Sequence, residues 1–70
     1  MLGRLMEITL NGEKEKTEEK TLADLMERRQ LHERRCATIV NGQIVRREER
    51  AKCELRPGDT VEIISMVGGG

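Results

Sequence analysis

The sequence predicts a small α+β domain, in which one main helix covers one face of a mixed sheet of four to five strands. Three observations predict it: an apolar pattern of period 2 near the start, one short amphipathic helical stretch after it, and a strand rich in β-branched residues near the end. At 70 residues the chain makes one domain with a thin core. Hydrophobic residues are 36% and none is aromatic, so aliphatic side chains must fill that core.

The first two strands are expected to form a hairpin. Apolar and polar side chains alternate over residues 6–10, which gives this strand one buried face. Asn11-Gly12 follows, and this pair favours the type I′ turn, in which both central residues have positive φ. Residues 13–17 alternate acidic and basic side chains and offer little apolar surface, as expected of a strand at the edge of a sheet.

One helix is expected after the hairpin. The hydroxyl of Thr21 can cap the first N–H groups of a helix. Leu22, Leu25 and Met26 then share one face at three- and four-residue spacing. The apolar stripe is short, so the helix is expected to run for about two to three turns and to end between residues 29 and 31.

Extended segments fill the second half of the chain. Residues 37–40 and 43–45 flank a second Asn-Gly turn. Residues 46–50 are interpreted as a solvated stretch, irregular or a single helical turn, before Cys53 and Leu55 return to the interior. The sequence Arg-Pro-Gly-Asp at residues 56–59 fits a type II turn and precedes the strongest strand, residues 60–67.

This order of elements is compatible with the β-grasp arrangement, in which the first and last strands lie side by side. We expect residues 6–67 to form the domain, residues 1–5 to be an N-terminal extension and residues 68–70 to be a flexible glycine tail.

Composition disfavours several classes of function. Thirteen basic and thirteen acidic side chains cancel to a net charge of zero, so the net charge does not indicate a class of partner. Nucleic-acid binding is disfavoured because no aromatic side chain is available to stack on bases. No apolar run is long enough for a membrane span or a signal peptide, which indicates a cytoplasmic protein.

Cys36 and Cys53 belong to no Cys-x-x-Cys pair, so neither a zinc site nor a dithiol redox motif is predicted. They are interpreted as buried or half-buried thiols. His32 and Cys36 could form a nucleophile and its base, but nothing in the sequence orients the imidazole, so no catalytic residue is assigned.

Gly68, Gly69 and Gly70 follow the strongest strand directly. Three glycines make a thin peptide that can enter a narrow enzyme channel. A C-terminal carboxylate is an anion at neutral pH and a poor electrophile, so it needs activation, for example by joining to AMP. The sequence has no phosphate-binding loop, so a separate enzyme is expected to perform that step. The alternative is an ordinary frayed chain end.

Three segments together carry a family resemblance. Residues 6–12 read MEITLNG, residues 40–45 read VNGQIV with Arg47 following, and residues 57–70 read PGDTVEIISMVGGG. In this order and spacing they resemble the sulfur carrier proteins of thiamine biosynthesis, which are ubiquitin-like β-grasp domains of comparable length. The sequence departs from that family at Arg46, Arg50 and Met66, where the family often has proline, tryptophan and an aromatic residue.

The resemblance implies a function for the chain end. An E1-like adenylyltransferase would use ATP to adenylate the Gly70 carboxylate, while Gly68 and Gly69 thread its active site. Sulfur from a cysteine desulfurase or another donor would then convert the carboxylate to a thiocarboxylate, and thiazole synthase would receive the sulfur. On this reading the protein is a substrate of partner enzymes, not an enzyme itself, and binds no cofactor or metal.

Ile64, Met66 and Val67 are candidate docking residues for such a partner. By period 2, Ile64 and Met66 share one face of the strand, and Ile63 and Ser65 share the other. The sequence does not say which face the helix covers, so a place in the core remains the alternative.

Three other kinds of function stay open. A related carrier could serve molybdopterin synthesis, tRNA thiolation or cysteine synthesis through the same thiocarboxylate. In a ubiquitin-like modifier, an amine would replace sulfide as the nucleophile. A β-grasp binding module would not need the tail at all.

Overall fold

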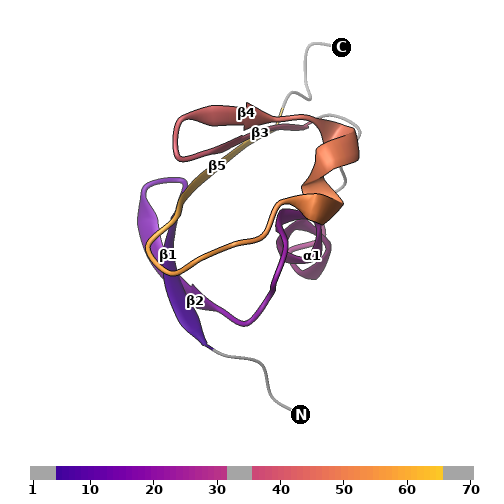
Figure 1. Ribbon diagram of the computed structural model, residues 1–70. Coiled ribbons are helices and arrows are strands. Elements are labelled where there is room, and N and C mark those ends of the chain that lie inside the picture. Colours follow the sequence, from indigo (N-terminus) through magenta and orange to yellow (C-terminus); the bar gives the residue numbers. More distant parts are fainter. Residues whose placement is uncertain (1–4, 32–35, 66–70) are drawn as a thin grey trace.

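The computed structural model describes residues 5–31 and 36–65. The elements follow in the expected order: β1 (Met6–Leu10), β2 (Glu13–Thr17), α1 (Leu22–Arg28), β3 (Cys36–Val40), β4 (Gln43–Val45), the 3-10 helix η2 (Arg47–Lys52) and β5 (Thr60–Ser65). The strands form one five-stranded sheet in the order β2-β1-β5-β3-β4 (Figure 1). β1 and β5 are parallel neighbours, and the other pairs are antiparallel. This mixed sheet with one main helix confirms the predicted β-grasp fold.

Both Asn-Gly pairs form the predicted hairpin turns. Asn11 and Gly12 have φ values of 51° and 86°, and Asn41 and Gly42 have 52° and 84°. These positive φ angles are those that a type I′ turn requires. The turns join β1 to β2 and β3 to β4, which places β2 and β4 at the two edges of the sheet.

Helix α1 ends at Arg28, one residue before the predicted range. Gln30 has a φ of 60°, and its N–H donates to the carbonyl of Glu27 at 3.0 Å. The N–H of Leu31 donates to the carbonyl of Met26 at 2.8 Å. This pair of bonds is a Schellman motif, which closes the helix and turns the chain back toward the sheet.

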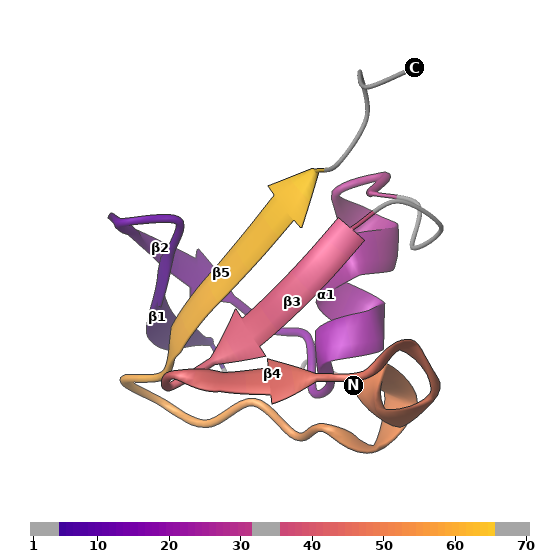
Figure 2. The same ribbon diagram turned by 90° about the horizontal axis from the view of Figure 1, so that it is seen from above.

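The core lies between α1 and one face of the sheet (Figure 2). Thr21 caps the helix as predicted, since its Oγ1 accepts from the N–H of Asp24 at 3.1 Å. The buried apolar side chains are Ile8, Leu10, Leu22, Leu25, Met26, Leu55, Val61 and Ile63. Among the described residues, α1 and η2 both lie on this face, so side chains at the alternate strand positions form a second face, which we call the open face.

The prediction that residues 46–50 are solvated is wrong for Arg50. Its side chain is only 5% exposed. Nε donates to Thr38 Oγ1 at 3.1 Å, and Nη2 donates to the carbonyl of Cys36 at 2.8 Å. The 3-10 helix η2 packs beside α1 and places the side chain of Arg50 against β3. The other charged residues of η2 are exposed.

Candidate functional site

β5 is the strand that leads toward the predicted site at Gly70. It lies in the middle of the sheet, where β1 and β3 hold it on both sides. Figure 2 shows β5 and β3 side by side with α1 behind them. Residues 66–70, which include Met66, Val67 and the three tail glycines, lie outside the described residues.

The open face of the sheet carries an aliphatic patch, which we define as Ala37, Ile39, Ile44 and Ile64. Ile44 is 77% exposed and Ile64 is 48% exposed. The sheet register pairs Ala37 with Ile64 and Ile39 with Ile44. The patch is therefore continuous across β4, β3 and β5, and contiguous exposed apolar surface of this kind is typical of interaction sites.

The two faces of β5 settle where Ile64 lies. Ile63 is 7% exposed and belongs to the core, so Ile64 points to the open face. The alternative that Ile64 is ordinary core is excluded. Docking through Ile64 stays a prediction, and Ala37, Ile39 and Ile44 are members of the patch that the sequence reasoning missed.

Charged side chains, together with Thr9 and Thr60, lie on the rest of the open face. Glu62 is exposed on β5, directly across from Ile39 of β3. Glu7, Lys14 and Lys16 lie on β1 and β2, at positions that alternate with the buried residues. The open face is thus aliphatic toward β4 and charged toward β2.

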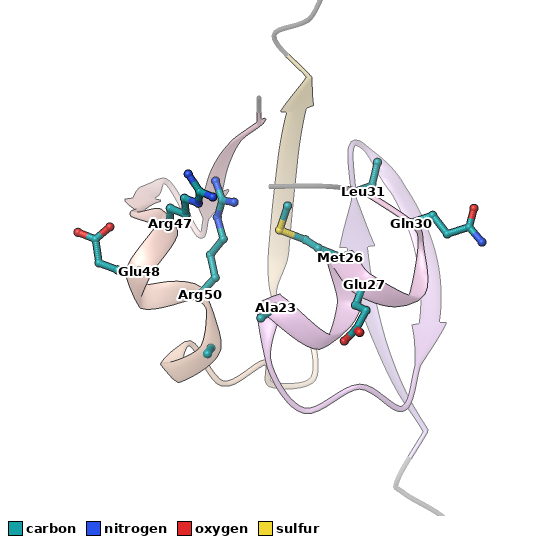
Figure 3. A pocket seen from close by; sticks show the side chains of 9 residues that line it. Ala23, Met26, Glu27, Gln30, Leu31, Arg47, Glu48 and Arg50 are labelled. Carbon is teal, nitrogen blue, oxygen red and sulfur yellow. The ribbon is translucent and has the colours of Figure 1, made fainter. Parts of the chain in front are cut away.

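A shallow groove of about 670 Å³ runs between α1 and η2, away from the open face (Figure 3). Met26, Leu31 and Ala23 give it an apolar lining from α1 and the residues after it. Arg47 and Arg50 line the opposite wall, on η2. No nucleophile with an adjacent base lines this groove among the described residues, so the groove offers binding surface and no assembled catalytic group.

The two thiols are half-buried, as predicted. Burial, together with the negative charge of Asp59, raises the pKa of the Cys53 thiol, which keeps it protonated at neutral pH. His32, the base in the alternative that pairs it with Cys36, lies outside the described residues.

The described part of the chain contains no group of three or more His, Cys, Asp and Glu side chains placed to hold a metal ion. Within the same residues, no helix has the length and apolar character needed to span a bilayer.

The fold, with a parallel first and last strand, one covering helix and an open face beside β5, defines a small ubiquitin-like β-grasp protein. A model of the ThiS family matches residues 1–70, and the chain belongs to this family of small sulfur carriers in thiamine biosynthesis.

The fold is similar to that of the thiamine biosynthesis protein ThiS from Geobacter metallireducens. The two have a TM-score of 0.78 and 23% sequence identity, over 93% of this chain and 100% of that chain. No curated protein sequence matches the chain.

Proposed function

We propose that this protein carries sulfur for the thiazole ring of thiamine as a thiocarboxylate on Gly70. The observation that carries the proposal is the match of the whole chain, residues 1–70, to the ThiS family. Two features of the molecule support it. The sequence after β5 ends in three glycines, and the strand that leads there is the centre of the sheet.

The chemistry begins with a poor electrophile. The Gly70 carboxylate attacks the α-phosphorus of ATP in the active site of an E1-like adenylyltransferase, and pyrophosphate leaves. The resulting acyl adenylate has a good leaving group. A persulfide formed by a cysteine desulfurase attacks the acyl carbon, AMP departs, and a second thiol reduces the sulfur–sulfur bond to leave the thiocarboxylate.

The composition of the tail suits such a reaction. Gly68 and Gly69 present no side chain to a narrow channel, and glycine adopts the backbone angles that bulkier residues resist. Thiazole synthase then takes the sulfur from the thiocarboxylate and returns the carboxylate. The carrier itself needs no bound cofactor, because ATP is bound by the adenylyltransferase.

The aliphatic patch is the surface that we assign to docking on the adenylyltransferase. It includes Ile64 of β5, the strand that leads into the tail, so docking there would bring the chain end to the partner. Met66 and Val67 extend this proposed docking segment toward the tail.

Intact mass spectrometry tests the proposal. The chain is incubated with the E1-like adenylyltransferase of its source organism, ATP, cysteine and the cysteine desulfurase. A gain of about 16 Da, sulfur in place of oxygen, is expected on the wild-type chain and not on a variant that lacks Gly69 and Gly70. Transfer of this sulfur to thiazole synthase would identify the pathway.

No mass gain with any sulfur donor would contradict sulfur carriage. Covalent ladders of the chain on other proteins, formed with ATP in place of a thiocarboxylate, would identify a protein modifier instead. A loaded chain that thiazole synthase does not discharge would place the carrier in another sulfur pathway.

A further inference from the structure

Glu62 is the acidic side chain that borders the aliphatic patch. It is exposed on β5, and the sheet register places it opposite Ile39 of β3. Ile64 lies two residues further along the same face of β5, and Ile44 pairs with Ile39 on the far side. By this register, the carboxylate has aliphatic neighbours along its own strand and across the sheet.

Glu62 makes no ion pair within residues 5–31 and 36–65. The ion pairs found there join Arg28 to Glu19 and Arg29 to Glu15. The lysines of the open face belong to β2, and β1 separates that strand from β5. Among the described residues, Glu62 is thus an exposed carboxylate without an ion-pair partner, and an exposed carboxylate is hydrated.

Docking on the aliphatic patch would remove that water. A carboxylate that loses its hydration without gaining a partner makes the complex less stable, whereas a carboxylate that meets a cation in the dry contact stabilises it and rejects surfaces of the wrong charge. We propose that Glu62 selects the partner of the aliphatic patch by pairing with a Lys or Arg side chain on that partner. This inference rests on the proposed function, in which the partner is the E1-like adenylyltransferase.

The same charge argues against a second copy of this chain as the occupant. Two patches packed face to face would bring two Glu62 carboxylates into one contact without a cation from either patch. The surface is therefore suited to a partner whose apolar area carries a basic side chain.

Three variants test the role of Glu62. Glu62→Lys reverses the charge at the patch, and Glu62→Gln removes it with little change of shape. Glu7→Lys is the matched control, since Glu7 is exposed on the same face but lies on β1, outside the patch. Thermal unfolding of each variant verifies that the fold is retained.

The measurement is ATP–pyrophosphate exchange by the adenylyltransferase of the source organism, with each variant as substrate. We expect Glu62→Lys to lower kcat/KM at least about tenfold, equivalent to about 1.4 kcal/mol, through KM. Glu62→Gln is expected to lose less, and its KM should rise less steeply with salt than that of the wild type, because the ion pair is screened. Glu7→Lys should behave like the wild type.

If Glu62→Lys keeps the KM and the salt dependence of the wild type while Ile64→Ser raises KM, the role of Glu62 is overturned and the proposed function is left intact. An adenylyltransferase that does not activate the wild-type chain would overturn the proposed function and this inference with it. A wild-type dimer that Ile44→Ser dissociates in sedimentation velocity would assign the patch to a second copy.

Discussion

Asn11 Oδ1 accepts a hydrogen bond from the backbone N–H of Ile63 at 2.9 Å, across 52 positions in the sequence. The parallel pairing of β1 with β5 ends at Leu10 and Val61. Beyond it, the N–H of Asn11 donates to the carbonyl of Val61 at 2.9 Å, and the side chain then reaches Ile63. Asn11, a turn residue, therefore makes two hydrogen bonds to β5 beyond the last paired residue of β1.

Asn41 supports the start of β5 from the other side. Its Oδ1 accepts from the N–H of Thr60 at 2.9 Å, and its Nδ2 donates to Asp59 Oδ1 at 2.9 Å. Each Asn-Gly turn therefore has two roles. The asparagine adopts the positive φ of the turn, and its side chain holds the central strand.

Replacement of Asn11 separates these two roles. Asn11→Asp keeps an acceptor for the N–H of Ile63 and tolerates positive φ, so its free energy of unfolding should stay close to that of the wild type. Asn11→Gly keeps the turn but loses the acceptor, and should cost about 1 kcal/mol. Urea unfolding measures both. Equal stability of the two variants would show that the side-chain bond contributes nothing.

Arg50 should be far more sensitive to substitution than its neighbour Arg47. Arg50→Lys replaces the two donor nitrogens of the planar guanidinium, which bond Thr38 and Cys36, with a single ammonium nitrogen, so we expect it to cost about 1–3 kcal/mol of the free energy of unfolding. Arg47→Lys, on the exposed side of the same 3-10 helix, should change it by less than about 0.5 kcal/mol. Urea unfolding of both variants compares them, and equal losses would contradict the structural role of Arg50.

Local patterns predict most of this fold because the elements are short and each has its own signal. The Asn-Gly pairs, the cap at Thr21 and the alternation in β1 all depend on neighbouring residues. Burial of Arg50 could not be predicted in this way. The run RREER in residues 46–50 is charged throughout, and the choice of which arginine turns inward depends on the hydroxyl of Thr38 and a β3 carbonyl that only the folded chain brings near.

The site was less predictable than the fold. The sequence identifies the glycine tail and Ile64, but the aliphatic patch exists only through the register of three strands. The strand that holds Ile44 is three residues long, too short for alternation to show which face a side chain takes. Its pairing with Ile39 assigns it to the open face.

Acid should weaken the fold partly through Glu19. Its carboxylate accepts a hydrogen bond from Thr17 Oγ1 and another from Arg28 Nη1 at 3.1 Å. The bond from Thr17, and then the arginine, lower the pKa of Glu19 below its ordinary value. Because the folded-state pKa is the lower one, this stabilisation is present above the unfolded-state pKa of about 4.3 and is lost as the pH falls through the folded-state value.

Thr17→Val removes that hydroxyl and nearly preserves volume. The pKa of Glu19 should then rise, as NMR titration can measure. The substitution should destabilise the fold more at pH 6 than at pH 3, because the bond from Thr17 favours the ionised form of Glu19. A packing effect alone would not vary with pH. A difference that is constant over this range would contradict the electrostatic role of Thr17.

The edge strand β2 carries its charges in a pattern that opposes pairing with another copy. Lys14 and Lys16 lie on the open face, whereas Glu13 and Glu15 alternate with them on the helix-covered face. An antiparallel β2–β2 pair with two-fold symmetry keeps equivalent faces together. It would therefore set lysine against lysine and glutamate against glutamate, and like charges directly opposite are destabilising.

Lys14→Glu should relieve this opposition. In the symmetric pair centred on Glu15, the new carboxylate at position 14 of each copy faces Lys16 of the other copy. Two opposite-charge pairs therefore form, and self-association should rise above that of the wild type. Lys20→Glu makes the same charge change at an exposed position outside the strand and serves as the control. Sedimentation velocity at low and high salt measures the effect, which salt should weaken. Identical behaviour of the two variants would mean that the lysines of β2 do not protect this edge.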